Sequence, residues 1–304
     1  MAEPLFLGID GGGTSCRARL RNAAGKLLGE GMGGAANARL DPALVRQSIL
    51  DAASAARAQA GLDEDAIWKR TYAGWGLAGA GQPVARTRLL AQEFPFATIS
   101  LDTDAYTAWL GATAAEHADN RGAILIVGTG VCGFMEREEQ RISIGGWGSI
   151  VSDDGSGAVT GREIIRRTLK VYDGLFPASP LTEAILAAIG PSVEAIVEWA
   201  DTAKPADFAR FAPLAYAHAA QDDPNARDIV EQAAHAISEL TLRLVTLGAP
   251  RVHMLGGLAQ TIQPWLSPAA QSCFAPPHAD ALDGAIVMAQ RNFASAGHGN
   301  GDAA

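Results

Sequence analysis

Two glycine-rich turns carry residue types that are suited to binding a phosphate chain. The first, Asp10-Gly11-Gly12-Gly13-Thr14, follows an apolar run at residues 5–9, and the second, Gly128-Thr129-Gly130, follows one at residues 123–127. Glycines let backbone N–H groups approach phosphate oxygens, a threonine adds a hydroxyl donor, and an aspartate at a strand end can hold Mg²⁺ through its waters. The turns predict an ATP site, although no lysine lies in a glycine-rich turn, which excludes a Walker A motif.

A tight hairpin is the simpler interpretation of either turn taken alone. The two turns occupy matched positions, however, and a third glycine pair, Gly256-Gly257, follows a predicted strand at 251–255. This repetition favours nucleotide binding over plain hairpins.

Residues 128–133 also match the pattern GxGxxG, and Asp153 stands at the distance of a ribose-binding acid. A dinucleotide site needs a helix that starts in the glycine loop, so that its N-terminus faces the pyrophosphate. Here the loop leads into a strand and a charged turn, so the sequence argues against a dinucleotide oxidoreductase.

Hydrophobic periodicity predicts two related halves. Strands are expected at residues 5–9, 17–20, 27–31, 71–77, 99–101, 123–127, 132–135, 141–144 and 251–255. Helices are expected at 42–60, 83–93, from Thr103 or Asp104 to about 115, through most of 156–247, and at 279–294. Two strand–turn–strand–turn–strand units begin at residues 5 and 123, and each opens with one of the glycine turns.

These motifs resemble those of a known superfamily. Residues 6–15 resemble the first phosphate motif of the actin/sugar-kinase/Hsp70 superfamily, 126–130 its second phosphate motif, and 253–257 its adenosine motif. Within it the chain is similar to the BadF/BadG/BcrA/BcrD branch, and most similar to bacterial glucosamine and N-acetylglucosamine kinases, over residues 5–292. The most specific stretches are 8–19 and Gly145-Gly146-Trp147-Gly148 with the residues 153–157 that follow.

The resemblance implies an α/β fold of two actin-like (ribonuclease H-like) lobes. Each lobe would hold a mixed sheet with flanking helices, with the active site in the interlobe cleft. The first lobe is expected at 1–117 with a C-terminal helix at about 283–296, and the second, with a helical insertion, at 118–282. Residues 297–304 are expected to form a flexible tail. The segment Asp283-Gly284-Ala285 resembles the place where a small residue lets the last helix pack on the first lobe.

The implied activity is an ATP-dependent kinase that phosphorylates the 6-hydroxyl of glucosamine or N-acetylglucosamine, with Mg²⁺ bound through water at Asp10. The sequence leaves the choice between the two sugars open. The residues implied in nucleotide binding are Asp10, Gly11, Gly12, Gly13, Thr14, Gly128, Thr129, Gly130, Gly256 and Gly257.

Asp104 is the implied catalytic base, because the resemblance gives this role to the aspartate just before the helix alanine. Its alternative role is a helix N-cap, and Asp102 is expected to be structural. The implied sugar-binding residues are Asn37, Asp104, Gly146, Trp147 and Asp153.

Each implied sugar contact has an alternative interpretation. Asn37 suits a turn, and Trp147 suits a hydrophobic core. Asp153 and Asp154 suit the cap of a helix that begins near residue 156. In addition, Val131 stands where related kinases often have serine, which puts a hydroxyl contact to phosphate or sugar in doubt.

Composition excludes several classes of function. The chain has 24 basic and 33 acidic side chains, a formal net charge of −9, so nucleic acid and anionic membrane surfaces are poor partners. Three distant cysteines and the lack of a signal-peptide pattern predict a cytoplasmic protein. The resemblance implies a homodimer. Two other functions stay open: an ATPase that activates a radical dehydratase through an iron–sulfur cluster, and a regulator that senses sugar or nucleotide.

Overall fold

The computed structural model describes residues 3–62, 65–117, 121–138, 140–190 and 192–298. The chain divides into two compact units: unit 1 comprises Met1–Glu116 with Pro277–Ala304, and unit 2 comprises His117–Pro276. Of the tail expected at 297–304, the first two residues belong to the last helix, and residues 299–304 lie outside the described residues.

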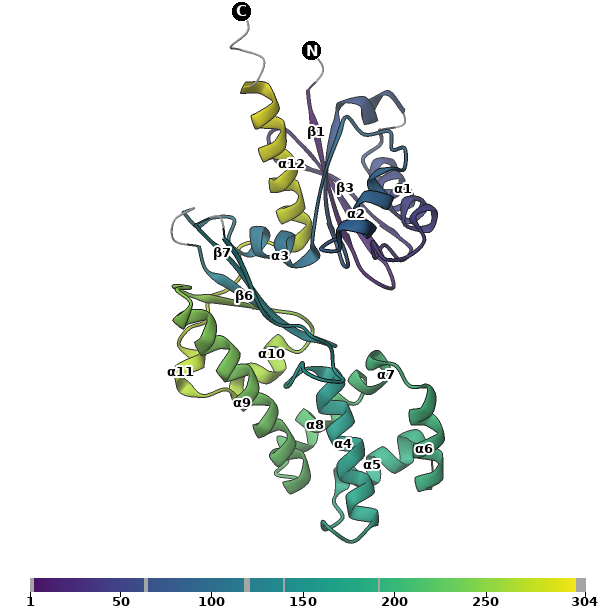
Figure 1. Ribbon diagram of the computed structural model, residues 1–304, viewed down its shortest axis with the longest axis vertical. Helices are drawn as coiled ribbons and strands as arrows, with labels where there is room; N and C mark the ends of the chain where they lie inside the picture. Colours follow the sequence, from purple (N-terminus) through teal and green to yellow (C-terminus); the bar gives the residue numbers. More distant parts are fainter. Residues whose placement is uncertain (1–2, 63–64, 118–120, 139, 191, 299–304) are drawn as a thin grey trace, which may run out of the picture. The chain divides into compact units, whose positions relative to one another are not determined.

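Unit 1 contains a five-stranded mixed sheet in the order β3-β2-β1-β4-β5 (Figure 1). The strands are β1 (Leu5–Gly11), β2 (Cys16–Asn22), β3 (Leu27–Gly33), β4 (Thr71–Leu77) and β5 (Thr98–Asp102). Antiparallel pairing joins β1 to β2 and β2 to β3, whereas β4 runs parallel to both β1 and β5. The five strands predicted for this half are confirmed.

The helical elements of unit 1 are α1 (Pro42–Gln59), η1 (Asp65–Arg70), α2 (Pro83–Leu90), α3 (Asp104–Ala112) and α12 (Ala281–His298). The side chain of Asp41 accepts hydrogen bonds from the N–H groups of Ala43 and Leu44, and so caps α1 as Asp41 and Pro42 suggest in the sequence. Helix α3 begins after the N-cap Thr103 and ends at Ala112, three residues before its predicted end.

Helix α12 lies beside β1 (Figure 1). Glycines, which have no side chain, permit this close approach. A Cβ atom at Gly8 of β1 would lie 2.3 Å from the Leu282 carbonyl oxygen, and one at Gly74 of β4 would lie 1.9 Å from that of Ala285. Gly284 likewise allows contact with α3, because its Cβ would lie 1.8 Å from the Thr107 carbonyl oxygen. The C-terminal helix therefore packs on the elements that carry the first glycine turn and Asp104.

Charged groups fix the start of α12 against β2. The Arg19 guanidinium contacts Asp280 at 2.7 Å, Asp283 at 2.9 Å and Glu30 at 2.8 Å. Arg21 adds a contact of 2.9 Å to Asp283. A network of several carboxylates around one partly buried arginine contributes more than an isolated surface pair.

Unit 2 repeats the start of unit 1. Its sheet has the order β8-β7-β6-β9, with β6 (Ala123–Val127), β7 (Val131–Arg137), β8 (Gln140–Gly145) and β9 (Val252–Leu255). As in the order β3-β2-β1-β4, an antiparallel three-stranded meander is followed by a parallel strand beside its first member. The predicted internal repeat is confirmed.

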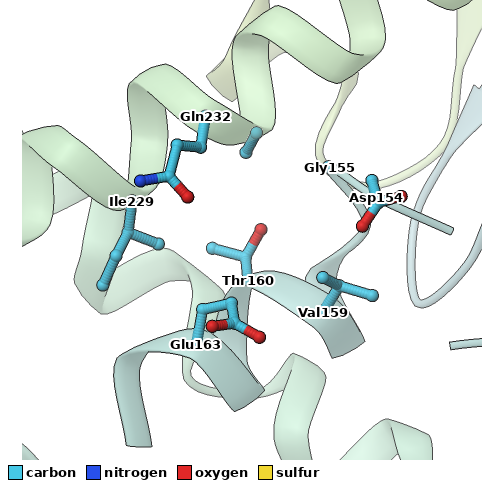
Figure 2. A pocket seen from close by; sticks show the side chains of 8 residues that line it. Asp154, Gly155, Val159, Thr160, Glu163, Ile229 and Gln232 are labelled. Carbon is cyan, nitrogen blue, oxygen red and sulfur yellow. The ribbon is translucent and has the colours of Figure 1, made fainter. Parts of the chain in front are cut away.

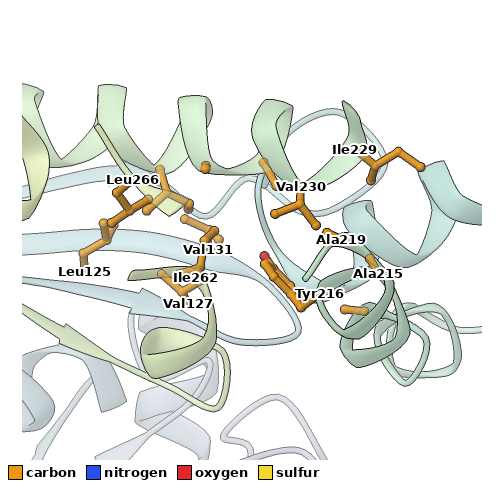
Figure 3. Packing of buried hydrophobic residues seen from close by; sticks show 14 of the residues in the cluster. Leu125, Val127, Val131, Ala215, Tyr216, Ala219, Ile229, Val230, Ile262 and Leu266 are labelled. Carbon is orange, nitrogen blue, oxygen red and sulfur yellow. The ribbon is translucent and has the colours of Figure 1, made fainter. Parts of the chain in front are cut away.

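Helices supply most of the remaining core of unit 2. They are α4 (Gly157–Tyr172), α5 (Pro180–Ile189), α6 (Val193–Thr202), α7 (Pro205–Ala209), α8 (Ala212–Ala219), α9 (Pro224–Thr246), α10 (Ala259–Ile262), η3 (Gln263–Trp265) and α11 (Pro268–Gln271). Figure 3 shows Leu125, Val127 and Val131 of the sheet beside Ile262 and Leu266 of the helical layer. Burial of this apolar surface stabilises the unit.

Within the described ranges, no single helix is long and apolar enough to cross a membrane. Among the described helices, α5 and α6 pass the length and composition test when taken together, with a bend of 63° between them.

The close packing of α12 predicts the effect of adding one methyl group. We expect Gly74→Ala to lower the free energy of unfolding by about 1–3 kcal/mol, because its Cβ would collide with the Ala285 carbonyl. Gly81→Ala is the matched control, since the nearest atom to its Cβ would be 3.5 Å away. Urea unfolding of both variants measures the difference. Equal stability of the two variants would contradict the packing argument.

Candidate functional site

The carboxyl ends of β1, β4 and β5 meet at one edge of the unit 1 sheet. Asp10 of β1 pairs with Gly76 of β4, and Gly76 pairs with Asp102 of β5, so the three residues form one row across the sheet. Asp104, the first residue of α3, follows two residues after Asp102. The parallel register therefore brings the first glycine turn and the predicted base to the same edge.

The missing side chain of Gly76 lets α3 lie close to this edge. A Cβ atom at Gly76 would lie 1.8 Å from Thr107 Oγ1, and that hydroxyl donates to the Asp104 carbonyl oxygen at 3.1 Å. Any larger residue at position 76 would displace the first turn of α3, and Asp104 with it.

Asp104 is not the N-cap that the alternative interpretation suggests. Thr103 fills that position, because its hydroxyl accepts a hydrogen bond from Tyr106 N–H at 3.2 Å. Asp102 accepts one from Thr103 N–H at 2.8 Å. Asp104 is exposed by surface area, although protein atoms surround its carboxylate, which accepts the N–H of Ala105 at 3.0 Å.

The surroundings of Asp104 favour its protonated form. Loss of hydration among neighbouring groups raises the pKa of Asp104, the hydrogen bond from Ala105 opposes this, and the Asp10 carboxylate raises the pKa further. A carboxyl group with a raised pKa accepts a proton more readily near neutral pH, as a general base requires.

Asp10 forms an ion pair that the sequence interpretation missed. Arg17 Nη2 lies 2.6 Å from Asp10 Oδ2, and the two residues are direct cross-strand partners of the β1–β2 hairpin. About half of the Arg17 side chain is exposed, at 49%. The antiparallel register across the turn is the signal that would have revealed this pair.

The first glycine turn is held by backbone bonds that leave its tip open. Gly12 N–H donates to Ser15 O at 2.9 Å, and Gly12 O accepts from Ala36 N–H at 2.9 Å. Gly13 and Thr14 are exposed, and a Cβ at Gly13 would meet no atom within 4 Å. The tip therefore has room for a bound anion.

Asn37 lies in the loop between β3 and α1, next to Ala36, whose N–H bonds to the first glycine turn. Its Oδ1 accepts Arg39 N–H at 3.0 Å, so the turn interpretation is confirmed. The loop is fixed to β4 by the bond from Ala38 N–H to Ala78 O, at 2.8 Å. In the described part of unit 1, the Asn37 amide nitrogen has no bonding partner, so it can still donate to a ligand.

The second glycine turn is attached to the N-terminus of α4. Gly157 N–H donates to Gly128 O at 2.8 Å, and Ala158 N–H donates to Thr129 O at 3.1 Å. Because these first-turn N–H groups of α4 are occupied, the helix positions the turn rather than binding an anion itself. Val131 is buried in the core at 2% exposure, so the side chain that replaces serine faces away from solvent.

Asp153 connects the second turn to the preceding loop. Its Oδ1 accepts Gly148 N–H at 3.2 Å, and its Oδ2 would lie 2.8 Å from a Cβ at Gly130. The residue is 8% exposed and has a φ of 62°, a left-handed conformation that is rare outside glycine. Ser156 caps α4, so the alternative role of Asp153 and Asp154 as caps is wrong.

Trp147 is not a core residue. Its side chain is 75% exposed, and Ile150 and Val151 of the same loop are 89% and 80% exposed. The preceding residue, Gly146, has a φ of 74°, and a Cβ atom there would lie 2.9 Å from the Cβ of Cys132. The indole is therefore available to pack on a ligand.

The Gly256-Gly257 pair directly follows β9 and lies next to Val127, the residue before the second glycine turn. A Cβ at Gly256 would lie 2.4 Å from Val127 O, whereas one at Gly257 would meet nothing within 4 Å. Unit 1 thus brings together Asp10, the first turn, Asn37 and Asp104, and unit 2 brings together the second turn, Gly146, Trp147, Asp153 and the Gly256-Gly257 pair.

The cysteines do not form a metal site within the described ranges. Cys16 is fully buried, its thiol contacts Ser48 O, and burial raises the pKa of this thiol to about 11. A protonated thiol is a poor ligand. No group of three or more His, Cys, Asp or Glu side chains in the described residues could hold a metal ion. The buried thiol of Cys16 is therefore a poor cluster ligand for the iron–sulfur alternative.

Comparison with known proteins gives a family and close relatives. The profile of the BadF/BadG/BcrA/BcrD ATPase family matches residues 7–286. Glucosamine kinase GspK of Vibrio cholerae is 40% identical over 284 residues, which cover 93% of this chain and 95% of the relative. N-acetyl-D-glucosamine kinase of Dictyostelium discoideum is 26% identical over 256 residues, 79% of each chain.

Solved structures agree with the fold. A Chromobacterium violaceum protein, provisionally described as an N-acetylglucosamine kinase, matches with a TM-score of 0.86 and 34% identity over 94% of this chain and 99% of its own. A ROK-family glucokinase from Streptomyces griseus, solved with glucose and AMPPNP, matches with a TM-score of 0.56 and 17% identity over 94% and 99%. The second likeness confirms the predicted fold class alone: two mixed sheets with helices.

The raised pKa of Asp104 predicts how pH affects stability. A carboxyl group whose folded pKa is raised binds its proton more tightly in the folded state, so its ionisation destabilises the fold. The free energy of unfolding of wild type should therefore fall as pH rises from the ordinary aspartate pKa of about 3.9 through the raised value. Asp104→Asn should not show this fall, so its stability relative to wild type should increase over the same pH range. Urea unfolding from acidic to neutral pH measures this, and a stability difference that does not change with pH would contradict it.

Proposed function

The chain belongs to the BadF/BadG/BcrA/BcrD ATPase family, and we propose that it is an ATP-dependent amino-sugar kinase that phosphorylates the 6-hydroxyl of glucosamine or N-acetylglucosamine. The observation that carries the proposal is the position of Asp104, a carboxylate with a raised pKa at the sheet edge that also holds the first glycine turn. The 40% identity to the Vibrio cholerae glucosamine kinase supports an amino sugar as acceptor.

The nucleotide is assigned to the glycine turns. Backbone N–H groups of Gly11, Gly12, Gly13 and Thr14 and of Gly128, Thr129 and Gly130 bind the phosphates in this proposal, with the Thr14 and Thr129 hydroxyls as further donors. Gly256 and Gly257 leave room for the adenosine, supported by the open space around Gly257. The exposed Arg17 supplies the cation that a chain without a Walker lysine otherwise lacks.

Magnesium is assigned to the nucleotide rather than to a resident metal site. The described residues contain no cluster of three or more suitable ligands, and one oxygen of Asp10 is engaged by Arg17. The other oxygen, Oδ1, suits a water-mediated contact to an ion that arrives with ATP. When bound, the ion neutralises charge on the phosphates.

Asp104 acts as the general base. The oxygen of the sugar 6-hydroxyl forms a bond to the γ-phosphorus while the bond from that phosphorus to the β–γ bridging oxygen breaks, and ADP leaves. The hydroxyl proton passes to the Asp104 carboxylate. Transfer is helped by the raised pKa, and positioning supplies most of the remaining acceleration.

The proposed sugar contacts are Asn37 and Trp147. The Asn37 amide nitrogen donates to a ring hydroxyl, and the exposed face of Trp147 packs on the ring. One carboxylate oxygen of Asp153 accepts the N–H of Gly148 and the other lies beside Gly130. In this proposal Asp153 therefore chiefly positions Gly146, Trp147 and the second turn. The proposal also includes a homodimer in the cytoplasm, where ATP is available.

The test of this proposal is a phosphorylation assay with glucosamine, N-acetylglucosamine, glucose and no sugar. We expect turnover with an amino sugar and a fall in kcat of about 10²–10⁴-fold for Asp104→Asn, with ATP affinity unchanged. Asp51→Asn, an exposed aspartate of α1, is the control. Sugar-independent ATP hydrolysis, or an Asp104→Asn variant as active as wild type, would overturn the assignment.

Arg17 gives a second prediction. We expect Arg17→Ala to raise the Kd for ATP by about 10–100-fold, because a charged hydrogen bond to phosphate is lost and Asp10 is left without its cation. Isothermal titration measures the change. Arg88→Ala, an exposed arginine of α2, should bind ATP as wild type does. Unchanged affinity in Arg17→Ala would remove Arg17 from the phosphate site.

A further inference from the structure

The loop between β8 and α4 presents three large apolar side chains to solvent. We call residues 146–156 the Trp147 loop, and the exposed side chains in it are those of Trp147, Ile150 and Val151. Apolar side chains in water gain free energy when they pack onto a nearby surface. A loop that keeps three of them exposed therefore needs contacts that hold its tip in place.

Bonds within the Trp147 loop fix the shape of its tip. Gly146 and Gly148, on either side of Trp147, have φ angles of 74° and 99°. Glycine has wide conformational freedom, so these positions cost more entropy to fix than other residues would. Gly148 O accepts the N–H groups of Val151 at 3.2 Å and Ser152 at 2.9 Å, which closes the tip into a turn.

Arg162 adds a contact from outside the loop. It lies on α4, and its Nη1 donates to the carbonyl oxygen of Ser149, two residues after Trp147. A hydrogen bond from a guanidinium is charge-assisted and stronger than one between neutral groups. The Arg162 side chain is partly buried, so water competes only in part for this bond.

Glu163 keeps the Arg162 guanidinium in place. Its Oε1 lies 3.5 Å from Arg162 Nε and 3.0 Å from Arg166 Nη1. Figure 2 shows Glu163 on α4 in a pocket that Asp154 of the Trp147 loop also lines. The carboxylate compensates the charge of Arg162 and limits the positions that its guanidinium can take.

The helix that carries Arg162 also holds the second glycine turn. The N–H groups of Gly157 and Ala158, in the first turn of α4, donate to carbonyls of that glycine turn. Arg162 follows about one helical turn later. We propose that Arg162 is a positioning residue, which holds the Trp147 loop in the conformation that binds the sugar. This inference rests on the proposed role of Trp147 as a sugar contact.

The KM for the amino sugar tests this role. We expect Arg162→Ala to raise KM about tenfold and to leave kcat within about twofold, because only molecules with an ordered loop bind sugar. Arg162→Lys, which keeps one charged donor, should restore most of the wild-type KM. Arg166→Ala, one turn along α4 and paired with the same Glu163, should behave as wild type.

A double-mutant cycle shows whether Arg162 acts through Trp147. In a Trp147→Ala background, which lacks the indole, Arg162→Ala should raise KM by less than about twofold. The same rise in both backgrounds would place the effect of Arg162 elsewhere in the molecule. No rise in the background with Trp147 would show that the bond to Ser149 is dispensable. Either result would overturn the proposal.

Chymotrypsin cleavage after Trp147 tests the loop without sugar or nucleotide. Cleavage there requires local opening, so its rate reports how often the tip is released. We expect the fragments 1–147 and 148–304, identified by mass, to form about tenfold faster in Arg162→Ala than in wild type or Arg166→Ala. Equal rates would overturn the proposal at any level of kinase activity. Faster cleavage in Arg162→Ala, with a wild type that phosphorylates no amino sugar, would instead overturn the proposed function.

Discussion

The parallel pairing of β1, β4 and β5 is the constraint on which the rest of the site depends. It aligns Asp10, Gly76 and Asp102 in one row, and the absence of a side chain at Gly76 lets α3 begin directly over that row. Two carboxylates, those of Asp10 and Asp104, are thereby held at one sheet edge, where that of Asp10 disfavours the charged form of Asp104. Arg17 forms an ion pair with the first carboxylate, and the pKa of the second is raised.

Unit 2 also positions a glycine turn at the end of a strand, but with different supporting contacts. Its meander repeats that of unit 1, but its glycine turn is held by the N-terminal N–H groups of α4 instead of by a neighbouring loop. Asp153, in a left-handed conformation, fixes the loop of Gly146 and Trp147 to this turn. Buried polar contacts of this kind position a site more firmly than exposed loops do.

Sequence reasoning recovered the strands, the repeat and the fold class because glycine turns and short apolar runs are local signals. It missed the Arg17–Asp10 pair, since a cross-strand contact depends on register rather than on motif. It also left open a core position for Trp147 and helix caps at Asp153 and Asp154, where the structure has an exposed indole and a Ser156 cap. Val131 shows the same limit, because only the fold reveals that its side chain faces the core.

In the proposed mechanism Asp104 accepts the hydroxyl proton, and its pKa is raised by loss of hydration and, to a smaller extent, by the Asp10 carboxylate. The most direct measurement is the pH dependence of kcat/KM for the amino sugar, in wild type and in Asp10→Asn. The account predicts an acid limb whose midpoint lies above the ordinary aspartate pKa of about 3.9 and moves to lower pH in the variant. A midpoint that is the same in both proteins, or a profile without an acid limb, would contradict it.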